Sequence, residues 1–243
     1  MKKTIILAAT LAVAGSLLSG CCKQNSESSP APLPEQYRPE TVDMGGNVLW
    51  ASFNLGATVP EELGFRLAWG EWAGKEKYDM QSYRFFDEAL YDEKGCYTAY
   101  NEEDGRMNLK PEDDPATLLL GEGWRLPDRT DFQWLIDHAE WHFVEVQGEH
   151  YGLRVISKVN GSVQYFPMVY NTGGPAVGAL PDFAISGGSL NYSTNGIPDG
   201  AGRLEKNTVC RLGYSGSLSH LVTHQFGAEW RYSGQFVRPV KVK

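Results

Sequence analysis

Two pairs of histidines have the spacing of metal ligands on a helix. His138 and His142 are four residues apart, and so are His220 and His224. This spacing brings two imidazoles to one face only where the backbone is helical. The sequence around His220 is typical of a strand or loop, and the first pair lies at the end of a predicted helix. We therefore interpret both pairs as surface or structural histidines and predict no metal.

Other residues that could do chemistry form incomplete patterns. No Gly-x-Ser-x-Gly turn is present to expose a serine nucleophile, and no glycine-rich loop is present to hold a phosphate. Asp113 and Asp114 could bind an ion, but they precede an apolar run, where carboxylates cap helices. Cys96 and Cys210 are far apart in the sequence, so they form either a disulfide or two buried thiols. We predict no catalytic residues and no cofactor; an enzyme with an unrecognised site is the alternative.

The amino end has the pattern of an export signal. Met1-Lys2-Lys3 is basic, and residues 4–18 are almost entirely apolar but too short to span a bilayer comfortably. The next residues, Leu18-Ser19-Gly20-Cys21, are similar to the bacterial lipobox, which is cut before a lipid-modified cysteine. We predict that residues 1–20 are a signal peptide and that lipid on Cys21 anchors the chain in the outer membrane. The sequence is compatible with an anchor on either the periplasmic or the outer face of that membrane.

The remaining chain divides into a linker and one domain. Residues 21–40 are polar and then proline-rich, a composition typical of a semi-extended tether. Residues 41–243 form the predicted domain and contain no second apolar run of membrane-spanning length. The net charge of -8 argues against nucleic acid as a partner, because phosphate binding needs a basic face.

Turn and capping signals predict a mixed set of elements. Gly45-Gly46 separates two short strands, and acidic residues before Pro115 favour a short helix. A longer helix follows over residues 131–139, capped by Asp128 or Thr130. Asn160-Gly161 is a strong hairpin signal. Residues 230–240 are expected to form one closing strand.

Residues 171–235 differ from the rest. Glycine, serine, asparagine and proline are frequent over residues 171–202, which we expect to be a long irregular segment of the kind that often binds ligands, and residues 208–214 return to strand character. Aromatic faces in this region could pack on sugar rings, anchor a protein interface or simply pack under the loop. The predicted ligand-binding candidates are Tyr192, Asn195, Arg203, Tyr214, His220, His224, Trp230 and Tyr232.

Several blocks, in order along the chain, resemble one protein family. They are Val42-Asp43-Met44-Gly45, Trp50-Ala51, Asn54-Leu55-Gly56-Ala57, Pro60-Glu61-Glu62, Ala68-Trp69-Gly70-Glu71, Glu112-Asp113-Asp114-Pro115-Ala116-Thr117, Gly123-Trp124-Arg125-Leu126-Pro127 and Phe236-Val237-Arg238-Pro239-Val240. Together they are similar to the Fibrobacter succinogenes major paralogous domain family. The blocks extend over residues 42–240, except that the family's Tyr-Trp-Ser-Ser-like block is replaced near Phe183–Gly188.

The resemblance implies an α+β class with a C-type lectin-like fold, related to the formylglycine-generating enzyme. Two helices would flank small antiparallel sheets, the amino and carboxyl strands would pair, and a long loop region would form the ligand face. Trp50, Trp69, Trp124 and Trp134 would lie in the core. Calcium binding is poorly matched, since Ile197-Pro198-Asp199 only partly resembles a lectin triplet. The pair of thiols that formylglycine chemistry needs near the carboxyl end is not present.

These observations lead to one main functional hypothesis. The chain is a lipoprotein of Bacteroidetes-type bacteria that acts as a non-catalytic binding module, with the membrane as one partner and a glycan or a protein as its ligand. A structural subunit of the envelope or of an adhesin tip is a second hypothesis.

Overall fold

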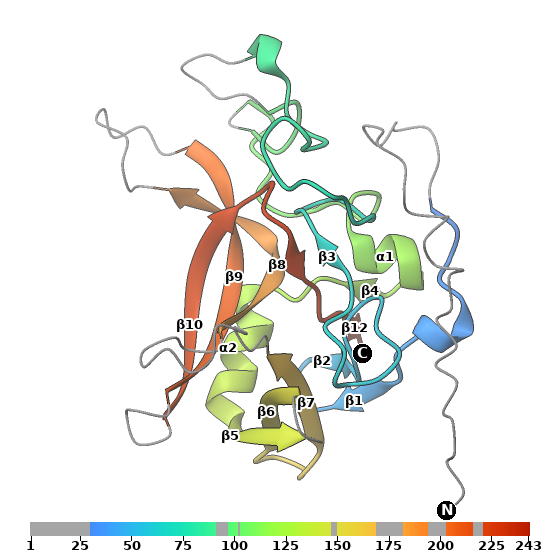
Figure 1. Cartoon of the computed structure of the whole chain (residues 1–243), viewed down its shortest axis with the longest axis vertical. Helices are drawn as coiled ribbons and strands as arrows, with labels where there is room; N and C mark the ends of the chain where they lie inside the picture. The colour runs from blue at the N-terminus through green and yellow to red at the C-terminus, as the bar shows by residue number, and fades with distance from the viewer. Residues whose placement is uncertain are drawn as a thin grey trace, which may run out of the picture.

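The chain is a mixed α and β structure with few helices and several small, mainly antiparallel sheets (Figure 1). The computed structural model describes residues 30–90, 97–101, 103–146, 150–168, 182–193, 203–215 and 221–243. Residues 146, 150 and 151, and the strands between residues 182 and 229, are described by their backbone positions. The described helices are α1 Pro115–Leu120 and α2 Arg129–His138, with 3-10 turns η1 Glu35–Tyr37 and η2 Glu88–Leu90. No helix among these residues is both long enough and apolar enough to cross a membrane.

The first sheet joins the two ends of the domain. Its strands, in spatial order, are β1 Thr41–Asp43, β2 Val48–Ala51, β12 Val240–Val242 and β4 Trp124–Arg125. β12 pairs with β2 in antiparallel register, Val240 opposite Trp50, so the expected pairing of amino and carboxyl strands is confirmed. The turn between β1 and β2 also forms as predicted, with Gly45 at φ +97° and its N–H donating to Asp43 at 2.7 Å.

The second group of elements follows the local signals closely. β5 Ala139–Val146, β6 His150–Ser157 and β7 Val163–Met168 form a three-stranded antiparallel sheet. Gly161, at φ +75°, makes the predicted hairpin turn between β6 and β7. Asp128 rather than Thr130 caps α2, and Asp131 completes the capping box.

The third sheet corrects the prediction for residues 171–202. Its order is β10 Leu221–Trp230, β9 Arg203–Ser215, β8 Asp182–Ser193, β11 Gln235–Phe236 and β3 Arg66–Leu67. The expected irregular segment therefore contains the long strand β8, whereas the strand expected over residues 208–214 is confirmed as part of β9. The sequence concealed β8 because Gly187-Gly188 lies in a register shift between Ser186 and Leu190, where a bulge breaks the alternation. The predicted single closing strand is also wrong: β10, β11 and β12 are separate, interrupted by a turn at Ser233 and by Pro239.

Three clusters of buried side chains hold these sheets together. The first centres on Trp50 between β2, α2 and the β5–β7 sheet, and a second, mostly aromatic cluster contains Trp69 and lies in the segment between β3 and α1. The third surrounds α1 and includes Leu33, whose N–H donates to Leu119 O, so residues 33–40 lie against the folded body. Of the tryptophans expected in the core, Trp50 and Trp69 are buried, while Trp124 and Trp134 are half-buried.

Arg238 is completely buried beside the first cluster, which the sequence did not predict. Its guanidinium donates to Asn54 Oδ1 at 2.7 Å, to Gln164 Oε1 at 3.0 Å and to the carbonyl oxygen of Tyr165 at 2.9 Å. The guanidinium also lies 4.5 Å from the ring centroid of Phe166. Burial lowers the pKa of Arg238 to about 9, so the side chain is still charged at neutral pH. A single cation therefore connects the segment after β2, the strand β7 and the carboxyl end.

We expect Arg238→Ala to lower the free energy of unfolding by at least about 3 kcal/mol, because it leaves several buried acceptors without donors. Urea denaturation would measure the loss. Arg154→Ala is the matched control, since Arg154 is exposed on β6, and it should cost less than about 0.5 kcal/mol. Equal costs for the two variants would contradict the assignment of Arg238 as a structural connector.

Candidate functional site

The predicted ligand-binding residues that the structure describes lie toward two ends of the third sheet. Tyr192 and Arg203 lie near the end of the third sheet at which Trp230 stands, because Ser193 is opposite Arg203 and Asn191 is aligned with Lys206 and Trp230. Tyr214 and His224 lie toward the other end, opposite Val222 and Leu212. Asn195 and His220 are outside the described residues, as are Cys21, Cys96 and the triplet Ile197-Pro198-Asp199. Cys210 lies in β9, paired with Phe226 of β10 and Ile185 of β8.

The separation along β9 is too large for one small ligand. Lys206 pairs with Trp230 and Tyr214 pairs with Val222, eight residues further along the strand. At about 3.3 Å per residue this places the two positions about 26 Å apart. The candidates therefore lie in two groups, and Trp230 and Tyr232 form a candidate site at one of the two ends.

Trp230 and Tyr232 form a stacked pair where β10 ends. Their ring centroids are 5.8 Å apart and the ring planes differ by 14°. Trp230 is 36% exposed, and Tyr232 is half-buried against the aromatic cluster that contains Trp69. The backbone turns here, with Ser233 N–H donating to Trp230 O at 2.9 Å. The two residues thus form a small aromatic platform at the edge of the molecule.

Arg231, between the two platform residues, is completely buried. Its guanidinium carbon lies over four aromatic rings, 4.2 Å from the centroid of Tyr97, 5.1 Å from Trp69, 5.5 Å from Tyr83 and 6.0 Å from Phe85. Attraction between a cation and the ring faces is stronger where water is excluded. Arg231 therefore points into the protein interior, whereas the neighbouring Trp230 and Tyr232 form a partly exposed aromatic pair.

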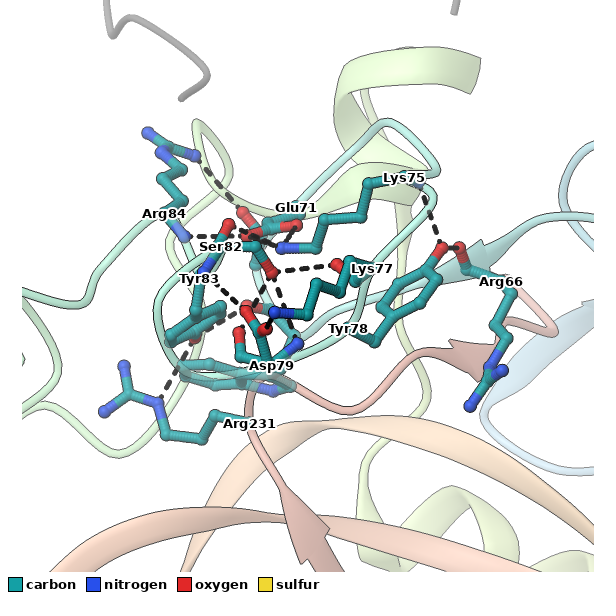
Figure 2. A network of polar contacts seen from close by, with 12 residues as sticks. Arg66, Glu71, Lys75, Lys77, Tyr78, Asp79, Ser82, Tyr83, Arg84 and Arg231 are labelled. Carbon is teal, nitrogen blue, oxygen red and sulfur yellow. Dashed lines mark hydrogen bonds and ion pairs between the residues drawn. The ribbon is translucent and has the colours of Figure 1, made fainter. Parts of the chain in front are cut away.

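Hydrogen bonds fix the position of Arg231. It donates to Tyr83 Oη at 3.3 Å, to Tyr100 O at 3.0 Å and to Ala99 O at 3.0 Å, and its own carbonyl accepts from Trp69 N–H. Figure 2 shows the arginine reaching Tyr83, whose hydroxyl in turn donates to Trp69 O at 2.8 Å. Burial raises the pKa of Tyr83, so the phenol stays protonated and remains a donor. Arg231 thereby connects the third sheet to the irregular segment between β3 and α1.

A polar network stabilises that irregular segment (Figure 2). The buried carboxylate of Glu71 pairs with Lys75 at 2.7 Å and accepts from Arg84 N–H at 2.7 Å. Arg84 extends to Asp113 at 2.8 Å, and the second oxygen of Asp113 accepts from Tyr100 Oη at 2.5 Å. These charges satisfy one another inside the fold, so the network holds the segment in place rather than presenting groups to a substrate.

A second cluster of ionisable groups lines a pocket of about 210 Å³ that includes Asp114, Arg125 and Asp128. Asp114 caps α1 by accepting from Ala116 and Thr117 N–H, and its other oxygen accepts from Leu126 N–H at 2.9 Å. Burial raises the pKa of Asp114 to about 6, despite these three donors. The predicted capping function of Asp114 is confirmed, whereas Asp113 is instead the partner of Arg84.

The histidines lie apart from this pocket. His138 ends α2 and stacks on Trp134, with ring centroids 4.4 Å apart, while His142 is in β5 near Glu140. His224 is in β10, so its backbone is extended rather than helical. Among the residues that the structure describes, no group of three or more histidines, cysteines or carboxylates is placed to hold a metal ion.

Sequence reasoning selected Trp230 and Tyr232 but missed Arg231 between them. The available signal was an arginine flanked by two aromatic residues at the end of an apolar strand. That pattern gives no indication of which rings would surround the cation, since all four come from residues 69–97, far away in the sequence.

Comparisons with protein-family models, with curated proteins and with solved structures found no match to this chain. The family resemblance of the sequence blocks stays a prediction.

We expect Arg231→Lys to loosen the segment between β3 and α1, because an ammonium cannot reach Tyr83, Ala99 and Tyr100 together. A local loss of about 2 kcal/mol corresponds to about thirty-fold faster amide exchange around Tyr83 and Tyr100. Hydrogen–deuterium exchange would measure this, with α2 as the internal reference and Arg154→Lys as the matched variant. Unchanged protection of the segment would contradict the connecting function of Arg231.

The raised pKa of Asp114 gives a pH dependence of known sign. The folded carboxyl holds its proton up to about pH 6 and the unfolded one only to about pH 4, so its stabilising contribution is present at low pH and is lost as the pH rises through 6. Relative to Asp114→Asn, the unfolding free energy of the wild type should fall by about 2 kcal/mol between pH 4 and pH 7. Denaturant titrations at both pH values test this. A difference that does not change with pH would show that the carboxyl has an ordinary pKa.

Proposed function

We propose that this protein is a non-catalytic binding module of the bacterial cell envelope, and that its ligand, a glycan or a protein, contacts the platform of Trp230 and Tyr232. The observation that carries the proposal is the stacked, partly exposed ring pair on either side of the fully buried Arg231. An aromatic pair at a surface offers a large apolar face together with polar ring atoms, which suits sugar rings and protein interfaces alike.

The platform is held in place before any ligand arrives. Hydrogen bonds to Tyr83, Ala99 and Tyr100 and the surrounding rings fix Arg231, and Arg66 Nε donates to Gly234 O at 2.7 Å on the other side of the turn. A side chain at position 234 would collide with Tyr78, since a Cβ would lie 2.6 Å from its ring. Because little ordering remains to be done on binding, more of the contact energy is available as affinity.

Location and fold class complete the proposal. The lipobox-like Leu18-Ser19-Gly20-Cys21 would anchor the chain in the outer membrane through lipid, with the following polar segment as a tether. The pairing of β2 with β12 and the flanking helices support the finer assignment to a C-type lectin-like fold.

The proposal predicts that Trp230→Ala weakens ligand binding about thirty-fold, equivalent to about 2 kcal/mol, without unfolding the protein. The full-length protein would be tested on a glycan array and in pull-downs from envelope extracts, with bound ligands then titrated against both forms. Val163→Ala is the control, because Val163 is 43% exposed on a different sheet. A wild type that retains neither glycan nor envelope protein, or a Trp230 variant that binds as the wild type does, would contradict the proposal.

A further inference from the structure

A second pocket, of about 440 Å³, is lined by the segment that leads into β1, by the end of α1 and by two strands of the first sheet. Arg38, Glu40 and Thr41 come from that segment and the start of β1, Leu120 ends α1, and Trp124 and Lys241 come from β4 and β12. Figure 1 shows α1, β4 and β12 side by side in this part of the molecule. A volume of this size is in the range of small-molecule sites.

Backbone pairing fixes the position of Lys241 in the pocket. Lys241 is directly opposite Trp124 in the antiparallel pair β12–β4, and its Nζ lies 5.7 Å from the ring centroid of Trp124. Thr117 Oγ donates to Trp124 O at 2.6 Å and connects this strand to α1. The cation–π contact orients the ammonium of Lys241 at the pocket without neutralising its charge.

The two cations of the pocket have little compensation from acidic side chains. Within the described part of the chain, the ammonium of Lys241 has no carboxylate within ion-pair distance. Arg38 donates through Nε to Leu33 O at 3.1 Å, and its closest carboxylate is Glu35, 4.0 Å away and 95% exposed. Exposed pairs at such a distance contribute little. Two cations and one carboxylate, Glu40, give this pocket a positive balance in a chain of net charge -8.

We propose that this pocket binds an acidic sugar, a pyranose ring that carries one carboxylate. Lys241 and Arg38 would bind the carboxylate, since charge-assisted hydrogen bonds to carboxylates are the stronger ones. Glu40 and Thr41 supply acceptors and a hydroxyl for the ring hydroxyls, and Leu120 and Trp124 supply apolar surface for the ring carbons. The mixture of cations, an acceptor carboxylate and a tryptophan favours a sugar over a bare inorganic anion, which would gain nothing from Glu40. The site is separate from the platform of Trp230 and Tyr232, so the two proposals stand independently.

The test is a titration of the full-length protein with glucuronate, followed by NMR or calorimetry, with glucose and inorganic phosphate as comparison ligands. Glucuronate should bind at least ten-fold more tightly than either, and Lys241→Gln should weaken its binding at least ten-fold. Lys243→Gln is the matched control, because Lys243 lies two residues further on, is paired with Asp43 and is not in the pocket lining. Thermal unfolding of both variants would show that they are folded.

Three results would overturn the proposal. If glucuronate binds no better than glucose, the pocket does not recognise a carboxylate. If phosphate or vesicles of anionic phospholipid bind as tightly as glucuronate, the pocket binds anions in general and does not recognise a sugar. Unchanged binding by Lys241→Gln would place the site elsewhere. Trp230→Ala should leave glucuronate binding unaltered, so failure here and failure of the platform are distinguishable.

Discussion

The arrangement of this molecule depends on a buried cation surrounded by aromatic rings. Arg231 is removed from water, and burying a charge costs several kcal/mol in real proteins. Ring faces, among them those of Tyr97 and Trp69, and oxygen acceptors, among them the carbonyls of Ala99 and Tyr100, offset that cost. Such compensation requires all of these groups at once, so the interaction selects one conformation of the long segment between β3 and α1, which has little regular hydrogen bonding of its own.

Arg238, at the other end of residues 231–238, is a second buried cation. Its charge is stabilised mainly by amide and carbonyl oxygens rather than by ring faces, and it holds the carboxyl-terminal strand against β7 and the residues after β2. Between the two arginines the chain makes only the short strand β11, Gln235–Phe236. The two cations therefore determine the path of residues 231–238, and with it the place where Trp230 and Tyr232 reach the surface. Structure and proposed function are connected through this path.

Elements with a local cause could be predicted from the sequence, and elements with a distant cause could not. Asp114 and Asp128 start helices through contacts with the next three residues, so the sequence indicated both helix starts, with Thr130 as the alternative cap of the second. Gly161 makes its turn by its own backbone freedom, and that turn was predicted correctly. Strand β8 receives its backbone partners from β9, and its glycines carry no signal of alternation. Likewise, Trp230 and Tyr232 were selected as aromatic residues, but the burial of Arg231 depends on rings that fold back from residues 69–97. The basic pocket escaped prediction for the same reason, since Arg38 and Lys241 are at opposite ends of the domain.

The environment of the Arg231 side chain is the most direct measure of this account. In a protein labelled at arginine with nitrogen-15, the Nε–H of Arg231 should be shifted upfield by the surrounding rings and should exchange with solvent far more slowly than that of the exposed Arg154. A resonance without ring-current shift, exchanging as fast as that of Arg154, would show that the guanidinium is in water and would contradict the burial of Arg231 among aromatic rings.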